Sequence, residues 1–403
     1  MKDLLKRIAS GIKRRIDPTD KGRVKRLMNH PPAVKPDSIV FVSSADYTGN
    51  PKALFLYMIE HGYNEKYKIT WLFEHKENMF DFGLPNVDTA LIWNKHGERT
   101  PAAQKAIMSA RYIFYSHNVN WARKYGEDQT FVNLWHGCGY KDNVKTDKKK
   151  IYYDYVIVTG HKYIEVFKEH LKDPDGNIVP LGYPRNEFFT SNRSSAAKEL
   201  EELKAKASAT KAVIWMPTYR KSVLSRLDSD TNMGDTGLPV LYEEKDLREF
   251  DEHCKKRGVL LVLKQHSLQS NYSVSLDPYS NIVFMDEQYL KDKDIELYEL
   301  MGRTDALLTD YSSTAIDYIL LDKPIGYTVD DFDEYQEARG WCLDNVKEYM
   351  AGHHIANMEE LKQFIDDVSD GLDPHKEWRN RIRPELQTYE DGFSKRILDY
   401  FGI

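Results

Sequence analysis

The chain has 403 residues, of which 41% are apolar and 30% charged, a composition that excludes a disordered protein and a length typical of two or three domains. No apolar run approaches the roughly 18 residues of a transmembrane helix, and the charged N-terminus excludes a secretory signal peptide. The three cysteines (Cys138, Cys254 and Cys342) are far apart, which argues against disulfides or a cysteine zinc site and favours a reducing, cytoplasmic location.

The first 26 residues are strongly basic, although the formal net charge of the whole chain is −6. They contain ten Lys or Arg and three Asp, a charge of +7 that leaves about −13 for the rest. Their apolar residues recur at helical spacing, so the predicted helix carries one narrow apolar stripe on a cationic surface. Such a helix is typical of attachment to an anionic membrane surface. Packing on its own domain is an equal alternative, whereas nucleic-acid binding is disfavoured because the acidic body offers no second basic surface.

Short apolar runs and helical stretches then alternate along the first half of the chain. Strands are predicted at 38–44, 68–73, 90–93, 112–116, 130–134 and 155–159, and helices at 51–61, 101–109 and 163–171. The charged, Ala-rich stretch 192–210 lacks Gly and Pro and predicts a solvated helix between two domains.

The second half repeats this alternation. Strands are predicted at 212–216, 259–264, 282–285, 306–309 and 324–328, and helices at 247–256, 313–321 and about 375–401, the last able to dock on either domain. This order predicts an α/β protein with two doubly wound, Rossmann-like domains facing a cleft. The expected divisions are a basic arm (1–30), an N-terminal domain (31–191), a C-terminal domain (192–375) and a C-terminal helix (376–403).

Candidate functional residues follow the strands directly, where ligands bind in such folds. His136, between a strand and two glycines, is placed to accept a proton near neutral pH, and Gly137 would let the backbone approach a ligand. The turn 309–313 (TDYSS) opens a helix on which Ser312 or Ser313 is a good N-cap residue, supported by Asp317, and could bind a phosphate.

Cations follow two further strands of the second half. Arg220 can bind a phosphate through two hydrogen bonds, and Lys264 and His266 follow the strand at 259–264. With the serines they predict a polyphosphate site. The chain has no P-loop and no dinucleotide GxGxxG, and neither an HExxH motif nor a spaced acid cluster argues for a catalytic metal.

Taken together, these motifs resemble the CDP-glycerol glycerophosphotransferase family of teichoic-acid synthesis, over roughly residues 38–365. The matching motifs are, in chain order, NPKA at 50–53, WHG at 135–137, GYPRN at 182–186, PTYR at 217–220, His266, TDYSS at 309–313, DY at 317–318, KP at 323–324 and RG at 339–340. The chain departs from the family pattern at Cys138, Gly139 and Ser267, and in the turn before Asn50, which leaves the acceptor open.

The resemblance implies a GT-B fold in which 31–191 is the acceptor-binding domain and 192–375 the CDP-polyol donor-binding domain. It implies transfer of glycerol phosphate from CDP-glycerol to a hydroxyl of a lipid-linked saccharide or poly(glycerol phosphate) acceptor, releasing CMP without a metal or cofactor. It implies that His136 and His266 are catalytic, with His136 the base and His266 also holding the donor diphosphate. Of the other positions, Arg220, Asp310, Ser312, Ser313 and Arg339 would lie on the donor side, and Asn50, Lys52 and Gly137 on the acceptor side or where the backbone approaches substrate. It also implies that the enzyme acts at the inner face of the cell membrane, which agrees with a basic arm that binds an anionic membrane surface.

Three alternatives remain open from the sequence. The enzyme could use CDP-ribitol or build a capsule polymer, it could be a GT-B glycosyltransferase that uses a nucleotide sugar, or it could be a non-catalytic scaffold. The length favours a primase or short-acting transferase over a polymerase with an extra module.

Overall fold

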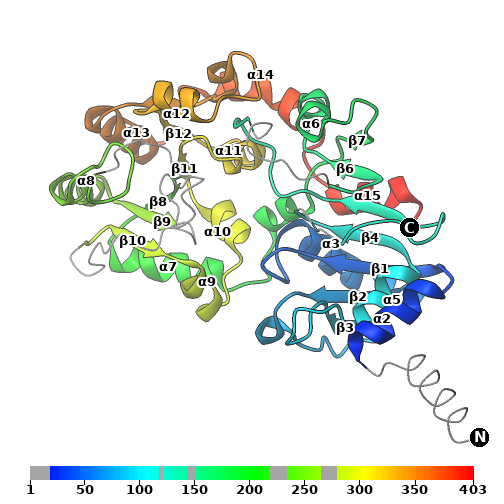
Figure 1. Cartoon of the computed structure of the whole chain (residues 1–403). Helices are drawn as coiled ribbons and strands as arrows, with labels where there is room; N and C mark the ends of the chain where they lie inside the picture. Colours follow the sequence, from blue (N-terminus) through cyan, green and yellow to red (C-terminus); the bar gives the residue numbers. More distant parts are fainter. Residues whose placement is uncertain (1–18, 118, 120, 143–150, 218–233, 265–278) are drawn as a thin grey trace, which may run out of the picture.

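The computed structural model describes residues 19–117, 119, 121–142, 151–217, 234–264 and 279–403. The described chain forms two parallel sheets, each in its own half of the molecule (Figure 1). The predicted α/β class with two doubly wound sheets is confirmed.

The first sheet has seven strands in the order β3-β2-β1-β4-β5-β6-β7, and every pair is parallel. Alternate residues of β1 face opposite sides, so Ile39 and Phe41 pack with α3 whereas Val40 and Val42 pack with α5. The strands are β1 (Lys35–Val42), β2 (Lys68–Phe73), β3 (Val87–Leu91), β4 (Ala110–Tyr115), β5 (Thr130–Asn133), β6 (Tyr155–Ile157) and β7 (Ile178–Val179).

The second sheet has six parallel strands in the order β10-β9-β8-β11-β12-β13. Its central strands are buried on both faces, which explains their continuous apolar runs. The strands are β8 (Lys211–Met216), β9 (Val259–Lys264), β10 (Ile282–Met285), β11 (Ala306–Thr309), β12 (Ile325–Thr328) and β13 (His353–Ile355). β7 and β13 were not predicted, because two or three residues carry no readable pattern.

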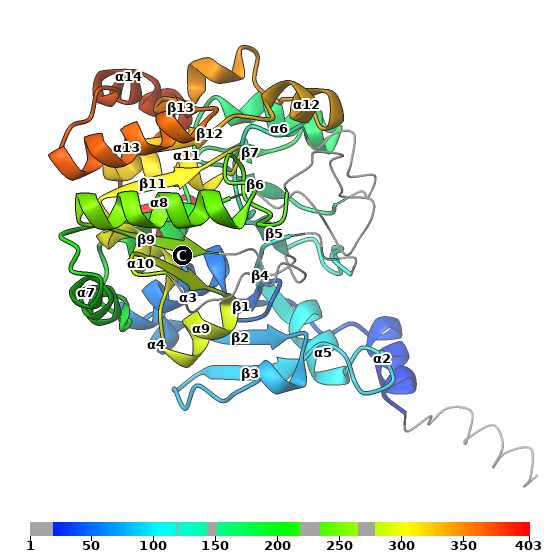
Figure 2. The same ribbon diagram turned by 90° about the vertical axis from the view of Figure 1, so that its left-hand side faces the viewer.

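Helices cover both faces of both sheets (Figures 1 and 2). The α-helices are α2 (Asp20–Asn29), α3 (Gly49–Glu60), α4 (Tyr63–Lys66), α5 (Pro101–Ser109), α6 (Tyr163–Leu171), α7 (Ala196–Lys206), α8 (Glu244–Arg257), α9 (Glu287–Asp292), α10 (Leu297–Arg303), α11 (Thr314–Tyr318), α12 (Phe332–Ala338), α13 (Met358–Asp370), α14 (Lys376–Leu386) and α15 (Phe393–Phe401). Short 3₁₀ helices are η1 (Lys76–Asn78), η2 (Pro184–Thr190), η4 (Ile319–Leu321) and η5 (Val346–Tyr349).

The C-terminal segment forms two helices rather than the single predicted one. α14 contains Pro384 and ends at Leu386, and α15 begins after Gly392, whose φ is +64°. α15 returns to the first domain, where Ile397 and Leu398 join its core and the Tyr112 hydroxyl donates to the Phe401 carbonyl at 2.8 Å. The last helix therefore ties the end of the chain to the N-terminal half.

Part of the basic arm packs on the first domain. Residues 1–18 lie outside the described residues, but the remainder of the arm enters α2, whose Thr19 caps the Gly22 N–H at 3.1 Å. α2 contacts α5, and Asn94 donates to the Asp20 carboxylate at 3.0 Å. Figure 2 shows α2 beside α5 at the outer edge of this domain. No helix within the described residues has the length and apolar character needed to cross a membrane.

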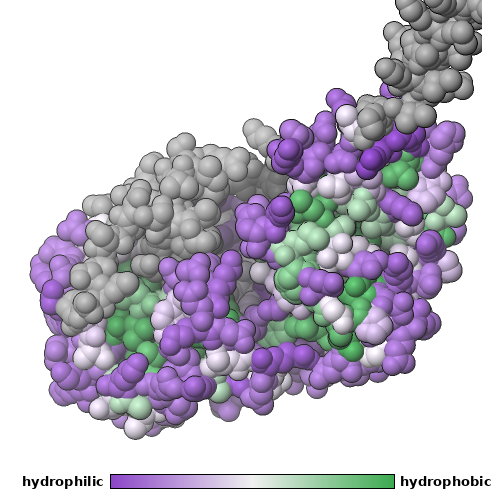
Figure 3. Space-filling view, turned by 90° about the horizontal axis from the view of Figure 1, so that it is seen from below, coloured by the Kyte–Doolittle hydropathy of each residue, from purple (hydrophilic) through white to green (hydrophobic). Residues whose placement is uncertain are grey.

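Apolar side chains gather on one face of the first domain (Figure 3). Met79, Phe80 and Leu84 are each 37–43% exposed and line a groove that also includes Lys68 and Lys105. This face belongs to the same domain as the basic arm.

Candidate active site between the two domains

The loop that follows β5 carries the predicted base and is held by Asn50. Asn133 accepts a hydrogen bond from the Trp135 N–H at 2.9 Å, and Trp135 has a φ of +53°. The Asn50 amide donates to the carbonyls of Leu134 and Trp135 at 2.9 and 3.0 Å, and its oxygen accepts from the Arg185 N–H at 3.2 Å. Asn50 is 1% exposed, so in this structure it fixes the loop.

His136 lies in a stack of aromatic rings. Its ring is 4.0 Å from the ring of His117 at an interplanar angle of 10°, and 4.9 Å from Trp135. His136 as a whole is nevertheless exposed to solvent. Partial withdrawal of the ring from water, followed by repulsion from His117 and Arg185, lowers the pKa of His136 well below its ordinary value. His136 is therefore neutral at pH 7, the state that a general base requires.

His117 was missed by the sequence reasoning, although it follows the predicted strand 112–116 directly. Its Nδ1 lies 3.1 Å from the Ser116 hydroxyl. Burial, then the neighbouring Arg185 guanidinium, lowers the pKa of His117 to about 4. The two stacked histidines are thus both neutral at physiological pH.

Replacing His117 by asparagine should move the acid limb of the kcat/KM profile to higher pH. Below about pH 4, where His117 is itself protonated, its charge repels a proton on His136. The change removes this repulsion, so the pKa of His136 rises, and the rate falls at a higher pH as the base becomes protonated. Profiles of wild type, His117→Asn and the exposed-loop control His96→Asn measure the shift. A limb that stays in place in His117→Asn would contradict this coupling.

Gly137 lies where the two domains touch. A Cβ atom on Gly137 would be 3.0 Å from Ser313 Cβ and would overlap Ser313 Oγ, and one on Gly139 would be 3.2 Å from Ser313 Cβ. In this structure the backbone at Gly137 lies close to Ser313 of the second domain, whereas its predicted approach to a ligand stays a prediction. The WHG and TDYSS motifs, about 180 residues apart in sequence, are in direct contact.

Gly137→Ala should destabilise the protein by about 1–3 kcal/mol, because the added methyl group overpacks this domain contact. Denaturant unfolding measures the effect. Ser313→Gly removes the opposing side chain but not the strain of an alanine at the Gly137 φ of +156°, a conformation that L residues rarely adopt. The loss caused by Gly137→Ala should therefore be smaller on the Ser313→Gly background than in the wild type. If Gly137→Ala caused an equal loss of unfolding free energy on the Ser313→Gly background, the destabilisation would not come from the contact with the Ser313 side chain.

A buried ion pair joins the two domains beside this contact. Arg185 donates through Nη1 to the His136 carbonyl at 2.8 Å and through Nη2 to the Asp317 carboxylate at 2.5 Å. Asp317 also accepts from the Tyr298 hydroxyl at 2.6 Å and from Asn186 at 3.3 Å. The prediction that Asp317 supports its own helix start is therefore wrong: its carboxylate binds residues of the other domain and of α10.

The TDYSS turn is partly buried, and its serines cap the helix only weakly. Asp310 and Tyr311 are 0% exposed, whereas Ser312 and Ser313 are partly exposed. Ser313 is the N-cap residue of α11 but makes no side-chain cap hydrogen bond, and Ser312 Oγ accepts from the Thr314 hydroxyl at 2.9 Å. Ser313 is thus the N-cap residue, as predicted for Ser312 or Ser313, but the side chain that accepts from the helix start is that of Ser312, from the Thr314 N–H at 3.4 Å.

The other predicted site residues are distributed along the cleft or fall outside the described residues. Lys52 forms a 2.7 Å ion pair with Glu296, which joins the first domain to the second. Lys264 pairs with Glu287 at 2.9 Å. Arg339 ends α12 and is partly buried. Arg220 and His266 lie outside the described residues, so their positions stay predictions.

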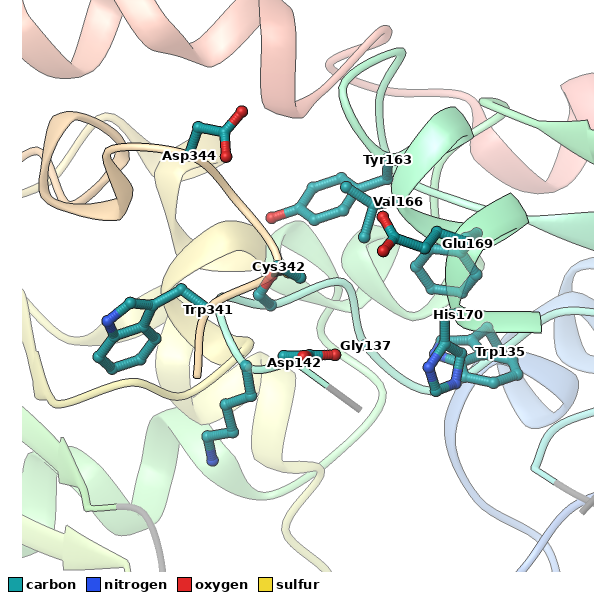
Figure 4. A pocket seen from close by; sticks show the side chains of 13 residues that line it. Trp135, Gly137, Asp142, Tyr163, Val166, Glu169, His170, Trp341, Cys342 and Asp344 are labelled. Carbon is teal, nitrogen blue, oxygen red and sulfur yellow. Dashed lines mark hydrogen bonds between the residues drawn. The ribbon is translucent and has the colours of Figure 1, made fainter. Parts of the chain in front are cut away.

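A cavity of about 210 Å³ lies between the domains next to the WHG loop (Figure 4). Trp135 and Gly137, which flank His136, line it together with α6 of the first domain and the segment 341–344 of the second. The second domain is held here by backbone pairing of Lys141 with Trp341 and by the Cys342 N–H, which donates to the Tyr140 carbonyl at 2.9 Å. In the part of the chain that the structure describes, no three His, Cys, Asp or Glu side chains cluster as a metal site would need.

The chain is similar in sequence to a known protein family and to several characterised proteins. The family model described as CDP-Glycerol:Poly(glycerophosphate) glycerophosphotransferase matches residues 24–401, which confirms the predicted resemblance. The teichoic acid glycerol-phosphate primase of Bacillus subtilis (strain 168) is 25% identical over 352 residues, 81% of this chain and 83% of the primase.

A second relative is considerably longer than this chain. The teichoic acid poly(glycerol phosphate) polymerase of Staphylococcus epidermidis is 25% identical over 394 residues, and the chain spans about half of it (48%). Other matched relatives are named as ribitol-phosphate primases or polymerases. The solved structure of the wall teichoic acid polymerase TagF superposes with a TM-score of 0.70 at 21% identity, covering 100% of this chain and 96% of that one. This likeness supports the predicted GT-B-like fold.

Proposed function

Because the chain belongs to the CDP-glycerol:poly(glycerophosphate) glycerophosphotransferase family, we propose that it transfers glycerol phosphate from CDP-glycerol to a hydroxyl group of an acceptor and releases CMP. The acceptor is a lipid-linked saccharide or a poly(glycerol phosphate) chain of a teichoic-acid or capsule-type polymer. The observation that carries the proposal is the direct contact of the His136 loop with the Ser313 turn across the domains. This contact places the neutral base His136 in the same cleft as the start of α11, which carries the hydroxyl groups of Ser312 and Ser313.

In the proposed reaction, the acceptor oxygen attacks the phosphorus that bears glycerol. The bond from this phosphorus to the bridging oxygen breaks, and CMP leaves with the electron pair. His136 accepts the hydroxyl proton, since a glycerol or sugar hydroxyl is a poor nucleophile near neutral pH. Ser312 and Ser313, with Asp310 and Arg339 on the same side, are assigned to the donor. Arg220 and His266 are also assigned to the donor, where they stabilise the charge that develops on the leaving CMP.

The test is CMP release by the full chain from CDP-glycerol, CDP-ribitol and UDP-sugars, each with a lipid-linked saccharide acceptor ending in glycerol phosphate. Release from CDP-glycerol supports the proposal. Release from UDP-sugars alone would replace it with the glycosyltransferase alternative, and silence with every donor would favour the scaffold.

CDP-ribitol is the second candidate donor, because relatives named as ribitol-phosphate enzymes match the chain at comparable identity. The chemistry at His136 would be the same for either polyol. If CMP were released from CDP-ribitol alone, the proposed site would stand and the donor would be CDP-ribitol instead of CDP-glycerol.

We also propose that the enzyme works at the inner face of the cell membrane, attached by the basic arm. Deleting residues 1–18 removes six cations but keeps α2, so the first domain stays intact. Binding to anionic vesicles should fall strongly, since each cation near the headgroups contributes about 1 kcal/mol. Co-sedimentation with anionic and with zwitterionic vesicles measures this, and undiminished binding of the deletion variant to anionic vesicles would contradict it.

A further inference from the structure

The described residues that line the cavity beside the WHG loop carry more negative than positive charge. Asp142, Glu169 and Asp344 line it with carboxylates, and Lys141 supplies an ammonium group among the described lining residues. In Figure 4, Asp142 lies between Trp341 on one side and Trp135 with His170 on the other. Because the negative charges of a phosphate and of these carboxylates repel each other, this lining disfavours the binding of a phosphate. Carboxylate oxygens are acceptors only and suit hydroxyl donors.

Aromatic side chains from both domains also line the cavity, beside Val166, Cys342 and two glycines. Trp135 packs edge-on against Phe167 of α6, with the ring centres 5.0 Å apart. Trp341, opposite, stacks on Phe332 and Tyr335 at 5.0 and 5.4 Å, which fixes its orientation. Rigid aromatic faces with a few polar groups are typical of small-ligand sites, and about 210 Å³ is below the roughly 300–1,000 Å³ of drug-sized sites. The cavity therefore has room for one small unit.

We propose that this cavity binds an uncharged, hydroxyl-rich unit of the acceptor, either a sugar ring or a polyol end. Trp135 and Gly137 line the cavity and flank His136 in sequence, so a unit bound here is held beside the loop that carries the base. Its place in the reaction rests on the proposed function, whereas the binding itself does not. Since both domains form the walls, binding also stabilises their contact.

Binding is measured first without any donor, through the tryptophan fluorescence of the full chain, whose seven tryptophans include Trp135 and Trp341 in the cavity wall. The full chain is titrated with the methyl glycoside of N-acetylglucosamine and, separately, with glycerol. A response to the glycoside assigns a sugar, and a response to glycerol alone assigns a polyol. The double variant Glu169→Ala/Asp344→Ala should bind at least about 10-fold more weakly. Glu165→Ala is the matched control, since it lies on the same helix, is exposed and does not line the cavity.

Three results would overturn the proposal: no response to either ligand, an equal response in the double variant, or inorganic phosphate binding as tightly as the neutral ligands. Kinetics then separate this inference from the proposed function. In an active enzyme, Glu169→Ala/Asp344→Ala should raise the acceptor KM about 10-fold and leave the KM for CDP-glycerol unchanged. A rise in the CDP-glycerol KM alone would assign the cavity to the donor and overturn the inference. An inactive enzyme that still binds the neutral ligand refutes only the proposed function.

Discussion

Replacing His136 by alanine should lower the rate of CMP release by about 10²–10⁴-fold, the usual contribution of a positioned general base. The alanine variant keeps the backbone carbonyl to which Arg185 donates, so the loop and the domain contact remain. Affinity for CDP-glycerol should change little, because the base acts on the acceptor hydroxyl. Single-turnover CMP release and calorimetric donor binding measure the two quantities separately.

The matched control is His161→Ala, an exposed histidine of the same domain near α6. It should retain wild-type turnover. If His136→Ala also retained near-wild-type turnover with donor binding intact, His136 would not be the base.

Asp317→Asn should lower the free energy of unfolding by about 3–5 kcal/mol, because it leaves the Arg185 guanidinium buried without its counter-charge. The two side chains are only 12% and 1% exposed. CMP release should fall as well, since Arg185 holds the His136 carbonyl and thereby the loop. Urea unfolding of wild type and variant gives the free energy.

Asp399→Asn provides the comparison, since it removes the same charge from an ion pair with Lys395 whose side chains are 57% and 62% exposed. A helical i,i+4 pair on the surface contributes only about 0.3–0.5 kcal/mol. If the two variants lost similar amounts of unfolding free energy, the buried Arg185–Asp317 pair would contribute no more to stability than a surface pair.

The sequence predicted the fold well because its information is local. Buried parallel strands such as β2 and β9 are mostly apolar, and their predicted bounds are those observed. The predicted 313–321 helix is α11 continued by η4. The prediction of a single C-terminal helix was wrong. Pro384 and Gly392 are local signals for the break between α14 and α15, whereas the return of α15 to the first domain is a contact that no local pattern encodes.

The site was predictable in its motifs but not in its contacts. Arg185 stands in the recognised GYPRN motif, yet its partner Asp317 lies 132 residues further along the chain. His117 also follows a strand, but no flanking glycine distinguished it from an ordinary polar residue. Asn50 was predicted on the acceptor side or at a backbone approach, and its amide binds the WHG loop, which only the folded chain reveals.

The most direct test of the central claim follows CMP and the mass of the acceptor in the same sample, with CDP-glycerol as donor and a metal chelator present. We expect each CMP released to be matched by one glycerol phosphate added to the acceptor, with the chelator without effect and His136→Ala slow. CMP release without a gain in acceptor mass, or a gain that requires added metal, would contradict a metal-independent glycerol phosphate transfer in this cleft.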